Sequence, residues 1–153
     1  MFAANDPLLP PYRKLKRTFG GNEVLLAAYV DPQVLTAAGI ERLAQLNARL
    51  QQVPGVLATL SIDSGPLGAR IIEQQNPLSK SYLALFEGYI IGADHQTVGV
   101  ACLLDPELEV SRQQVVDEIR KIIHTHDATG MLVGELVMVV DGFEYVEQDG
   151  RRL

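Results

Sequence analysis

The hydrophobic pattern of this chain alternates between strand-like runs and helix-like periodicities. Four continuous apolar runs of strand length are bounded by turn residues, which is typical of β-strands. Aspartate and proline close the first and third runs. The predicted strands are residues 23–31, 56–63, 97–105 and 131–140.

Between the first two strands, apolar residues recur every three or four positions, as on one face of an amphipathic helix. The sequence predicts a helix within residues 35–53, with Thr36 or Asp31 as its cap and Pro54-Gly55 as its stop. Its apolar face consists of Leu43, Leu46, Leu50 and Val53.

A second helix is predicted after the third strand. Ser111 and Gln114 fit a capping box, in which the two side chains satisfy backbone amides at a helix start. The helix is expected to end near His126. Its apolar face consists of Val115, Val116, Ile119, Ile122 and Ile123.

A third helical pattern lies in residues 79–91, between the second and third strands, with Ser79 as its expected cap and a turn following at 93–96. Residues 64–78 are predicted to form a loop with a helical turn at 69–74. The proline-rich start is expected to be irregular, with one helical turn around 12–18.

This order of elements predicts an α+β fold of the ferredoxin-like type. Two strand–helix–strand units form a βαββαβ sandwich, a four-stranded antiparallel sheet with helices on one face and an inserted helix between strands 2 and 3. We divide the chain into a lead-in (1–22), the sandwich (23–140) and a polar tail with some helical character (141–153). The fold alone names no function.

Composition narrows the class of protein. Hydrophobic residues make up 47% and charged residues 21%, which are ordinary values for a globular domain. A net charge of −6 argues against a nucleic-acid-binding basic face. The single cysteine, Cys102, excludes an internal disulfide and a Cys-pair zinc site. No apolar run is long enough to cross a bilayer, and the start lacks the order of a signal peptide, so these features alone predict a soluble cytoplasmic protein.

Candidate catalytic groups are sparse. His124 and His126 stand two residues apart, and such positions face away from each other on a helix, which favours a solvated helix end over a metal site. Whether they bind a metal stays open. The acidic residues mostly close strands or occupy turns, and no G-x-S-x-G elbow or glycine-rich phosphate loop is present. We therefore expect no enzymatic activity, no cofactor and no metal.

Aromatic residues offer one candidate binding site. Tyr82, Phe86 and Tyr89 lie on the inserted segment, where they either face a ligand or belong to a satellite helix that covers the core. The satellite helix is the simpler interpretation.

Several short motifs follow one another along the chain. They are Phe19-Gly20-Gly21-Asn22-Glu23, Val30-Asp31, the helix with Leu43, Leu46 and Leu50, Val53-Pro54-Gly55-Val56, the turn at 91–97, the glycine-containing strand at Val133-Gly134-Glu135, and the tail at 141–149. In this order the motifs resemble the periplasmic porter domain of RND-superfamily exporters, in the MmpL-like and hopanoid-transporter-like branch. The resemblance covers roughly residues 19–150 and depends on the order and spacing of the motifs.

The resemblance implies transport. In such exporters the membrane helices carry the proton relay, and porter domains move to open a path for a hydrophobic or lipid-like substrate. The implied partners are the transmembrane helices and second porter domain of a parent transporter, with a possible homo-oligomer and no nucleic acid. The implied location is the periplasmic side of the bacterial inner membrane, and the missing signal peptide would then reflect a segment of a longer protein. No relay residue transfers to this chain, and Tyr82, Phe86 and Tyr89 are expected to border the substrate path.

An alternative of another class is a free-standing ferredoxin-like module that binds a small molecule and regulates a partner. The tail distinguishes the two hypotheses. A membrane connector needs the polar run at 144–152, which the resemblance places before a transmembrane helix, whereas a free-standing module does not.

Overall fold

A computed structural model describes residues 23–64 and 76–152 of the chain. The lead-in at 1–22, with its expected turn at 12–18, lies outside the described residues. The same holds for the helical turn expected at 69–74.

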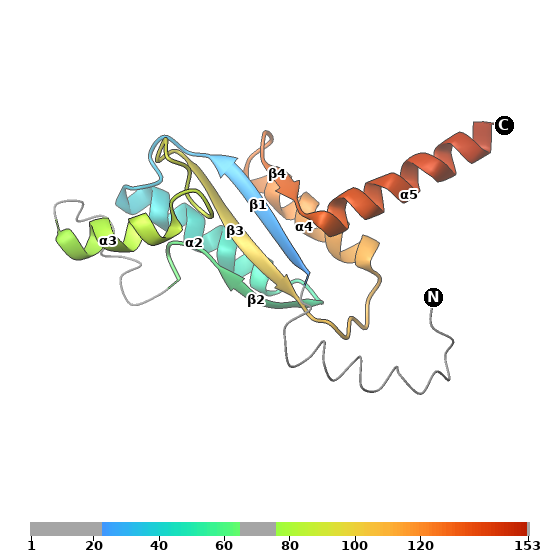
Figure 1. Cartoon of the computed structure of the whole chain (residues 1–153), viewed down its shortest axis with the longest axis horizontal. Coiled ribbons are helices and arrows are strands. Elements are labelled where there is room, and N and C mark those ends of the chain that lie inside the picture. The colour runs from blue at the N-terminus through green and yellow to red at the C-terminus, as the bar shows by residue number, and fades with distance from the viewer. Residues whose placement is uncertain (1–22, 65–75, 153) are drawn as a thin grey trace.

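The described residues form an α+β structure around a four-stranded antiparallel sheet (Figure 1). The order across the sheet is β2-β3-β1-β4, and each neighbouring pair is antiparallel. This arrangement is consistent with the ferredoxin-like class. The strands are β1 (Val24–Val30), β2 (Val56–Leu60), β3 (Thr97–Leu104) and β4 (Met131–Val133).

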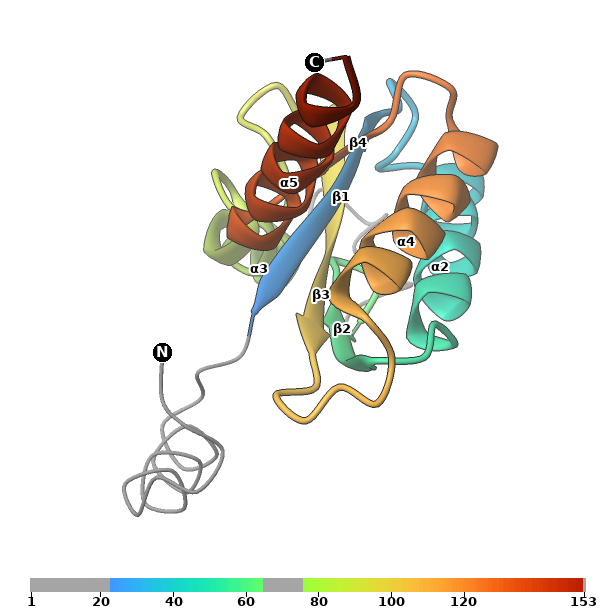
Figure 2. The same ribbon diagram turned by 90° about the vertical axis from the view of Figure 1, so that its right-hand side faces the viewer.

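Two long helices cover one face of the sheet. Helices α2 (Ala37–Gln51) and α4 (Arg112–His126) lie side by side there (Figure 2). The hydroxyl of Thr36 accepts from the Gly39 amide at 3.1 Å, and Ser111 forms the complete capping box. Both helix starts follow the sequence prediction for Thr36 and Ser111, because side-chain oxygens satisfy otherwise unpaired amides.

The core lies between these helices and the sheet. Alternate β1 side chains Leu25, Ala27 and Tyr29 point toward the helices and are at most 5% exposed. The predicted apolar faces of both helices are buried opposite them, including Leu43 of α2 and Ile119 of α4. Burying these side chains is the main source of stability, at roughly 1.5–3 kcal/mol for each large aliphatic group.

The inserted helix begins two residues earlier and ends five residues earlier than the predicted range 79–91. Helix α3 (Pro77–Phe86) is capped by Asn76, whose side chain accepts from the Leu78 amide at 3.0 Å, so the prediction of Ser79 as the cap was wrong. Proline at the first helical position has no amide to satisfy, which places the start before Ser79. After the helix, Ile91 forms an isolated bridge to Val98 of β3.

The prediction of a strand at 131–140 is confirmed for residues 131–133 and is wrong for the rest. Strand β4 ends at Val133, and helix α5 (Glu135–Arg152) follows at once. Gly134 has φ +152, in the region that favours glycine, and the chain turns there. The apolar run continues with Leu136, Val137 and Val140, a helical spacing whose side chains are buried.

Helix α5 crosses the boundary predicted between residues 140 and 141. Its first turns pack against β1, β4 and α4, and its far end projects away from the sheet (Figure 1). Arg120 of α4 donates to Asp141 at 2.8 Å, and Gln113 donates to Glu144 at 2.7 Å. The helical character expected of the tail is confirmed up to residue 152.

Replacing Gly134 with alanine is expected to destabilise the protein by about 1–3 kcal/mol. A Cβ there would lie 2.8 Å from both Leu25 Cδ2 and the Val24 carbonyl oxygen, at a backbone angle that L-residues avoid. Urea denaturation measures the change. Gly142→Ala is the matched control, since a Cβ at Gly142 meets nothing within 4 Å, and it should be neutral or stabilising. Equal effects of the two variants would contradict this account of the turn.

Candidate functional site

The sheet face opposite α2 and α4 is almost entirely apolar. Because directly paired residues share a face, the register defines its members from the outward residues of β1. We call this surface the open sheet face. It consists of Val24, Leu26, Ala28, Val30, Ala58, Leu60, Thr97, Gly99, Ala101, Leu103, Met131 and Val133.

The residues of the open sheet face are as apolar as those of a protein core, but its large rim side chains are exposed to solvent. An antiparallel sheet with one solvated face normally alternates apolar and polar residues. Here Thr97 is the only polar member, and none is charged. Large side chains around its rim are nevertheless 46–63% exposed, including Val30, Leu60 and Met131. Such a surface is typical of an interaction site.

The size of the open sheet face can be estimated from its strands. They contain seven, five, eight and three residues. At about 3.3 Å per residue and about 4.8 Å between strands, the projected area is roughly 350 Å². Apolar patches of roughly 300–600 Å² are the largest on typical monomers and are often functional.

Sequence reasoning did not identify this site, although a signal was present. The strand runs at 23–31 and 97–105 lack polar alternation, which indicates strands with two apolar faces. Only the pairing register shows that these outward residues gather on one surface.

The structure brings together two of the three aromatic residues predicted to border a path. The rings of Tyr82 and Phe86 lie 4.9 Å apart in an edge-to-face arrangement, partly buried against the core. The Tyr82 hydroxyl also donates to the Ser64 carbonyl at 3.0 Å. Tyr89 follows the helix and is 80% exposed. The contacts of Tyr82 and Phe86 fasten α3 to the domain, and a role in a substrate path stays a prediction.

A polar network holds the turn after β2, where Ser61 and Asp63 lie. The buried amide of Asn47 on α2 donates to Ser61 Oγ at 3.2 Å and to Ser64 Oγ at 3.0 Å. Its amide nitrogen also lies 3.2 Å from Asp63 Oδ2, and Thr59 donates to its carbonyl oxygen. These groups satisfy one another, as buried polar groups must, so the network is a structural anchor for the turn.

The two predicted histidines have different surroundings. His124 is exposed, whereas His126 is partly buried, with its ring 4.6 Å from that of Tyr29. Burial lowers the pKa of His126; Asp127 and Asp31 oppose that change, while Arg49 and Arg42 add to it. The Tyr29 hydroxyl is buried without a hydrogen-bond partner among the described residues, and burial raises its pKa.

An ion pair between Arg42 and Asp31 holds the turn between β1 and α2. The Arg42 guanidinium donates twice to Asp31 Oδ2, at 2.7 and 3.0 Å, and Asp31 Oδ1 accepts from the Gln33 amide at 2.8 Å. Asp31 therefore stabilises the turn into α2 and does not cap that helix.

The described parts of the chain hold no group of three or more histidine, cysteine, aspartate or glutamate residues placed to bind a metal. None of the helices within 23–64 and 76–152 is both long and apolar enough to cross a bilayer. Burial raises the pKa of the Cys102 thiol to about 12, so this thiol is not a nucleophile at neutral pH.

Comparison with protein-family models and with curated protein sequences finds no match for this chain.

The environment of His126 predicts that stability declines as pH falls. The folded protein binds the His126 proton less tightly than the unfolded chain, where histidine has a pKa of about 6.5. Below that pH the unfolded state takes up more protons, and the free energy of unfolding decreases. Urea denaturation between pH 7.5 and pH 5.5 should show a smaller decrease for His126→Gln than for the unchanged protein. His124→Gln is the control and should behave as the unchanged protein; a decrease of the same size in all three would contradict the prediction.

Proposed function

We propose that this chain is an extracytoplasmic porter domain of a proton-driven RND-superfamily exporter and forms part of the conduit for a hydrophobic or lipid-like substrate. In the same proposal the fold is a ferredoxin-like βαββαβ sandwich with α3 inserted between its second and third strands. The strand order β2-β3-β1-β4 supports this topology. The observation that carries the functional proposal is the open sheet face.

The open sheet face supports a domain that works as part of a larger assembly. A solvated apolar surface of this kind costs free energy, which docking against another apolar surface removes. Its projected area of roughly 350 Å² is below the ~800 Å² per partner of a stable complex. Twice this area, which counts the surface of both partners, is roughly 700 Å². This value lies within the ~600–1,500 Å² of interfaces between domains of one chain. A second porter domain of the same transporter fits this size.

The surface of helix α5 supports the proposal that the tail is a connector to membrane helices. Its outward side carries apolar residues that the domain does not bury: Met138, Val139, Phe143, Tyr145 and Val146 are 48–71% exposed. The inward side is fixed to α4 through Asp141 and Glu144. A helix anchored at one end and apolar on its free side suits a link between this domain and membrane helices, the other proposed partners.

In this proposal the membrane helices transfer the protons, and this domain does not. The role of this domain is to bind substrate, to exclude water along the path and to move against its neighbours. The proposed location is the periplasmic side of the bacterial inner membrane.

An immunoblot of fractionated source cells, with an antibody against this chain, tests the proposal. We expect a band several times larger than the 16.8 kDa of this chain in the inner-membrane fraction. A soluble band near 16.8 kDa would overturn the exporter proposal and favour the free-standing regulatory module.

Charges on the open sheet face are expected to impair export by the intact transporter. Val30→Lys combined with Met131→Lys would place two ammonium groups in the proposed interface between domains, while each site tolerates a polar group in the folded domain because it is already solvated. Export of a labelled lipid-like substrate from cells is the measurement, with the amount of transporter in the membrane as reference.

The matched control is Leu78→Lys combined with Leu85→Lys, which changes two exposed leucines of α3, 64% and 71% exposed. Normal export by the Val30/Met131 variant, or equal loss in both variants, would contradict the role of the open sheet face. Tyr82→Ala with Phe86→Ala tests the predicted path residues in the same assay, and unchanged export would remove them from the path.

A further inference from the structure

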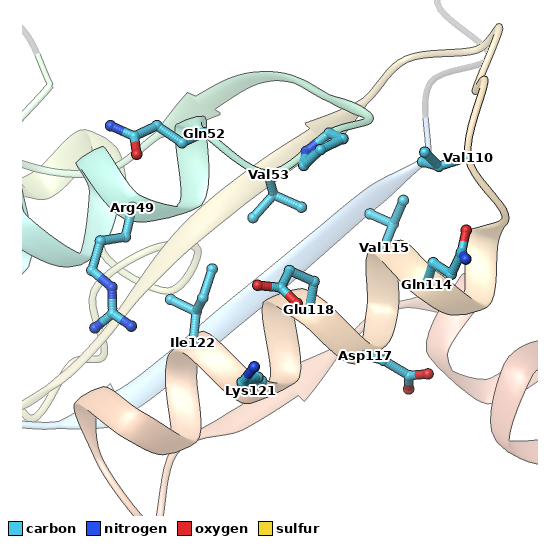
Figure 3. A pocket seen from close by; sticks show the side chains of 11 residues that line it. Arg49, Gln52, Val53, Val110, Gln114, Val115, Asp117, Glu118, Lys121 and Ile122 are labelled. Carbon is cyan, nitrogen blue, oxygen red and sulfur yellow. The ribbon is translucent and has the colours of Figure 1, made fainter.

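A groove between α2 and α4 forms a second apolar surface, on the other side of the domain from the open sheet face. Its volume is about 860 Å³, at the upper end of the roughly 300–1,000 Å³ of small-molecule sites. The buried side chains of Val53, Val115 and Ile122 form its apolar floor, with Val110 at one end (Figure 3). Pro54 also lines the groove. We call it the α2–α4 groove.

Two cations from different helices lie at the other end of the groove. Figure 3 shows Arg49 of α2 and Lys121 of α4 on either side of Ile122. Neither side chain makes a hydrogen bond or an ion pair with any residue in the described part of the chain. They contrast with Arg42, Arg112 and Arg120, each of which is paired with a carboxylate.

The carboxylates of the groove leave it with a positive balance. Asp117 lies 3.8 Å from Arg120 in an ion pair and points away from the groove floor in Figure 3. Glu118 lies near the middle of the groove, between Val53 and Val115. Glu118 makes no ion pair within residues 23–64 and 76–152. Together with Arg49 and Lys121 it gives the groove a net charge of about +1 at neutral pH.

We propose that the α2–α4 groove binds a single-chain amphiphile with an anionic head group, such as a fatty acid. The carboxylate lies between Arg49 and Lys121, and the alkyl chain extends over Ile122, Val115 and Val53 toward Val110. Charge complementarity selects the anionic head, and the apolar floor selects the chain. The inference identifies this ligand as the exported substrate, and in that respect it rests on the proposed function. The binding itself requires only this chain.

Other ligand classes match the groove less well. A cationic amphiphile meets two like charges at Arg49 and Lys121, and an uncharged one gains nothing from them. A nucleotide would find no aromatic ring among the lining residues on which its base could stack. An anionic head with one alkyl chain uses both the charged end and the apolar floor.

A titration of the isotope-labelled chain, followed by amide chemical shifts, tests the site. The probe is dodecanoate below its micelle concentration, and dodecyl maltoside is the uncharged comparison. We expect shifts confined to the groove-lining parts of α2 and α4 and tighter binding of dodecanoate. Because exposed charge pairs contribute up to about 1 kcal/mol, Arg49→Gln and Lys121→Gln should each weaken dodecanoate binding by roughly twofold to fivefold.

Two further variants make the test specific. Glu118→Gln removes the opposing carboxylate and should tighten dodecanoate binding by a similar factor, whereas a merely structural role of Glu118 would not. Arg151→Gln is the control for loss of a positive charge, since Arg151 is an exposed residue of α5 far along the chain from the groove, and it should leave binding unchanged.

Three results would overturn the proposal: no binding of dodecanoate, equal affinity for the uncharged amphiphile, or shifts on the open sheet face in place of the groove. The outcome is independent of the cell-fractionation test. Groove binding together with a soluble 16.8 kDa protein would retain this site and reject the exporter, and a membrane location without groove binding would do the reverse.

Discussion

The packing of α2 and α4 against a single face of the sheet is the interaction on which the rest of this structure depends. It buries Leu25, Ala27 and Tyr29 of β1 and thereby fixes which side of every strand is inside. Since the strands are apolar on both sides, satisfying one face leaves the other without a cover from these helices. The fold is stable because the first face is buried, and the second face is left as the apolar open sheet face.

The two sides of the domain also differ in their electrostatic character. The open sheet face contains no charge, so contact with another apolar surface there requires no desolvation of ions. The helix layer carries a paired charge at Asp31–Arg42, and also Arg49 and Lys121, which make no ion pair with the residues that the structure describes. Shape complementarity can therefore govern recognition on one side, while charge can select a partner on the other.

Most of the framework was predictable from the sequence, because local signals and tertiary packing agree for β1, β3, α2 and α4. The Ser111 capping box and the Thr36 cap are short-range interactions that a sequence specifies directly. The segment 131–140 was mispredicted because an apolar run of that length suits a strand or a buried helix equally, and the decision depended on the backbone angle at Gly134. The candidate sites were less predictable still. The open sheet face requires the pairing register, and the groove joins Arg49 to Lys121, which are 72 positions apart in the sequence.

The attachment of α5 has a mechanical consequence. From Asp141 and Glu144, which are fixed to α4, the helix continues to residue 152, about 12 Å farther at 1.5 Å per residue. A helix transmits force along its axis with little bending, so a pull or a twist applied near residue 152 reaches Arg120 and Gln113 before it reaches the sheet. Because α4 also forms one wall of the groove, the position of α5 is coupled to that wall through Arg120 and Gln113.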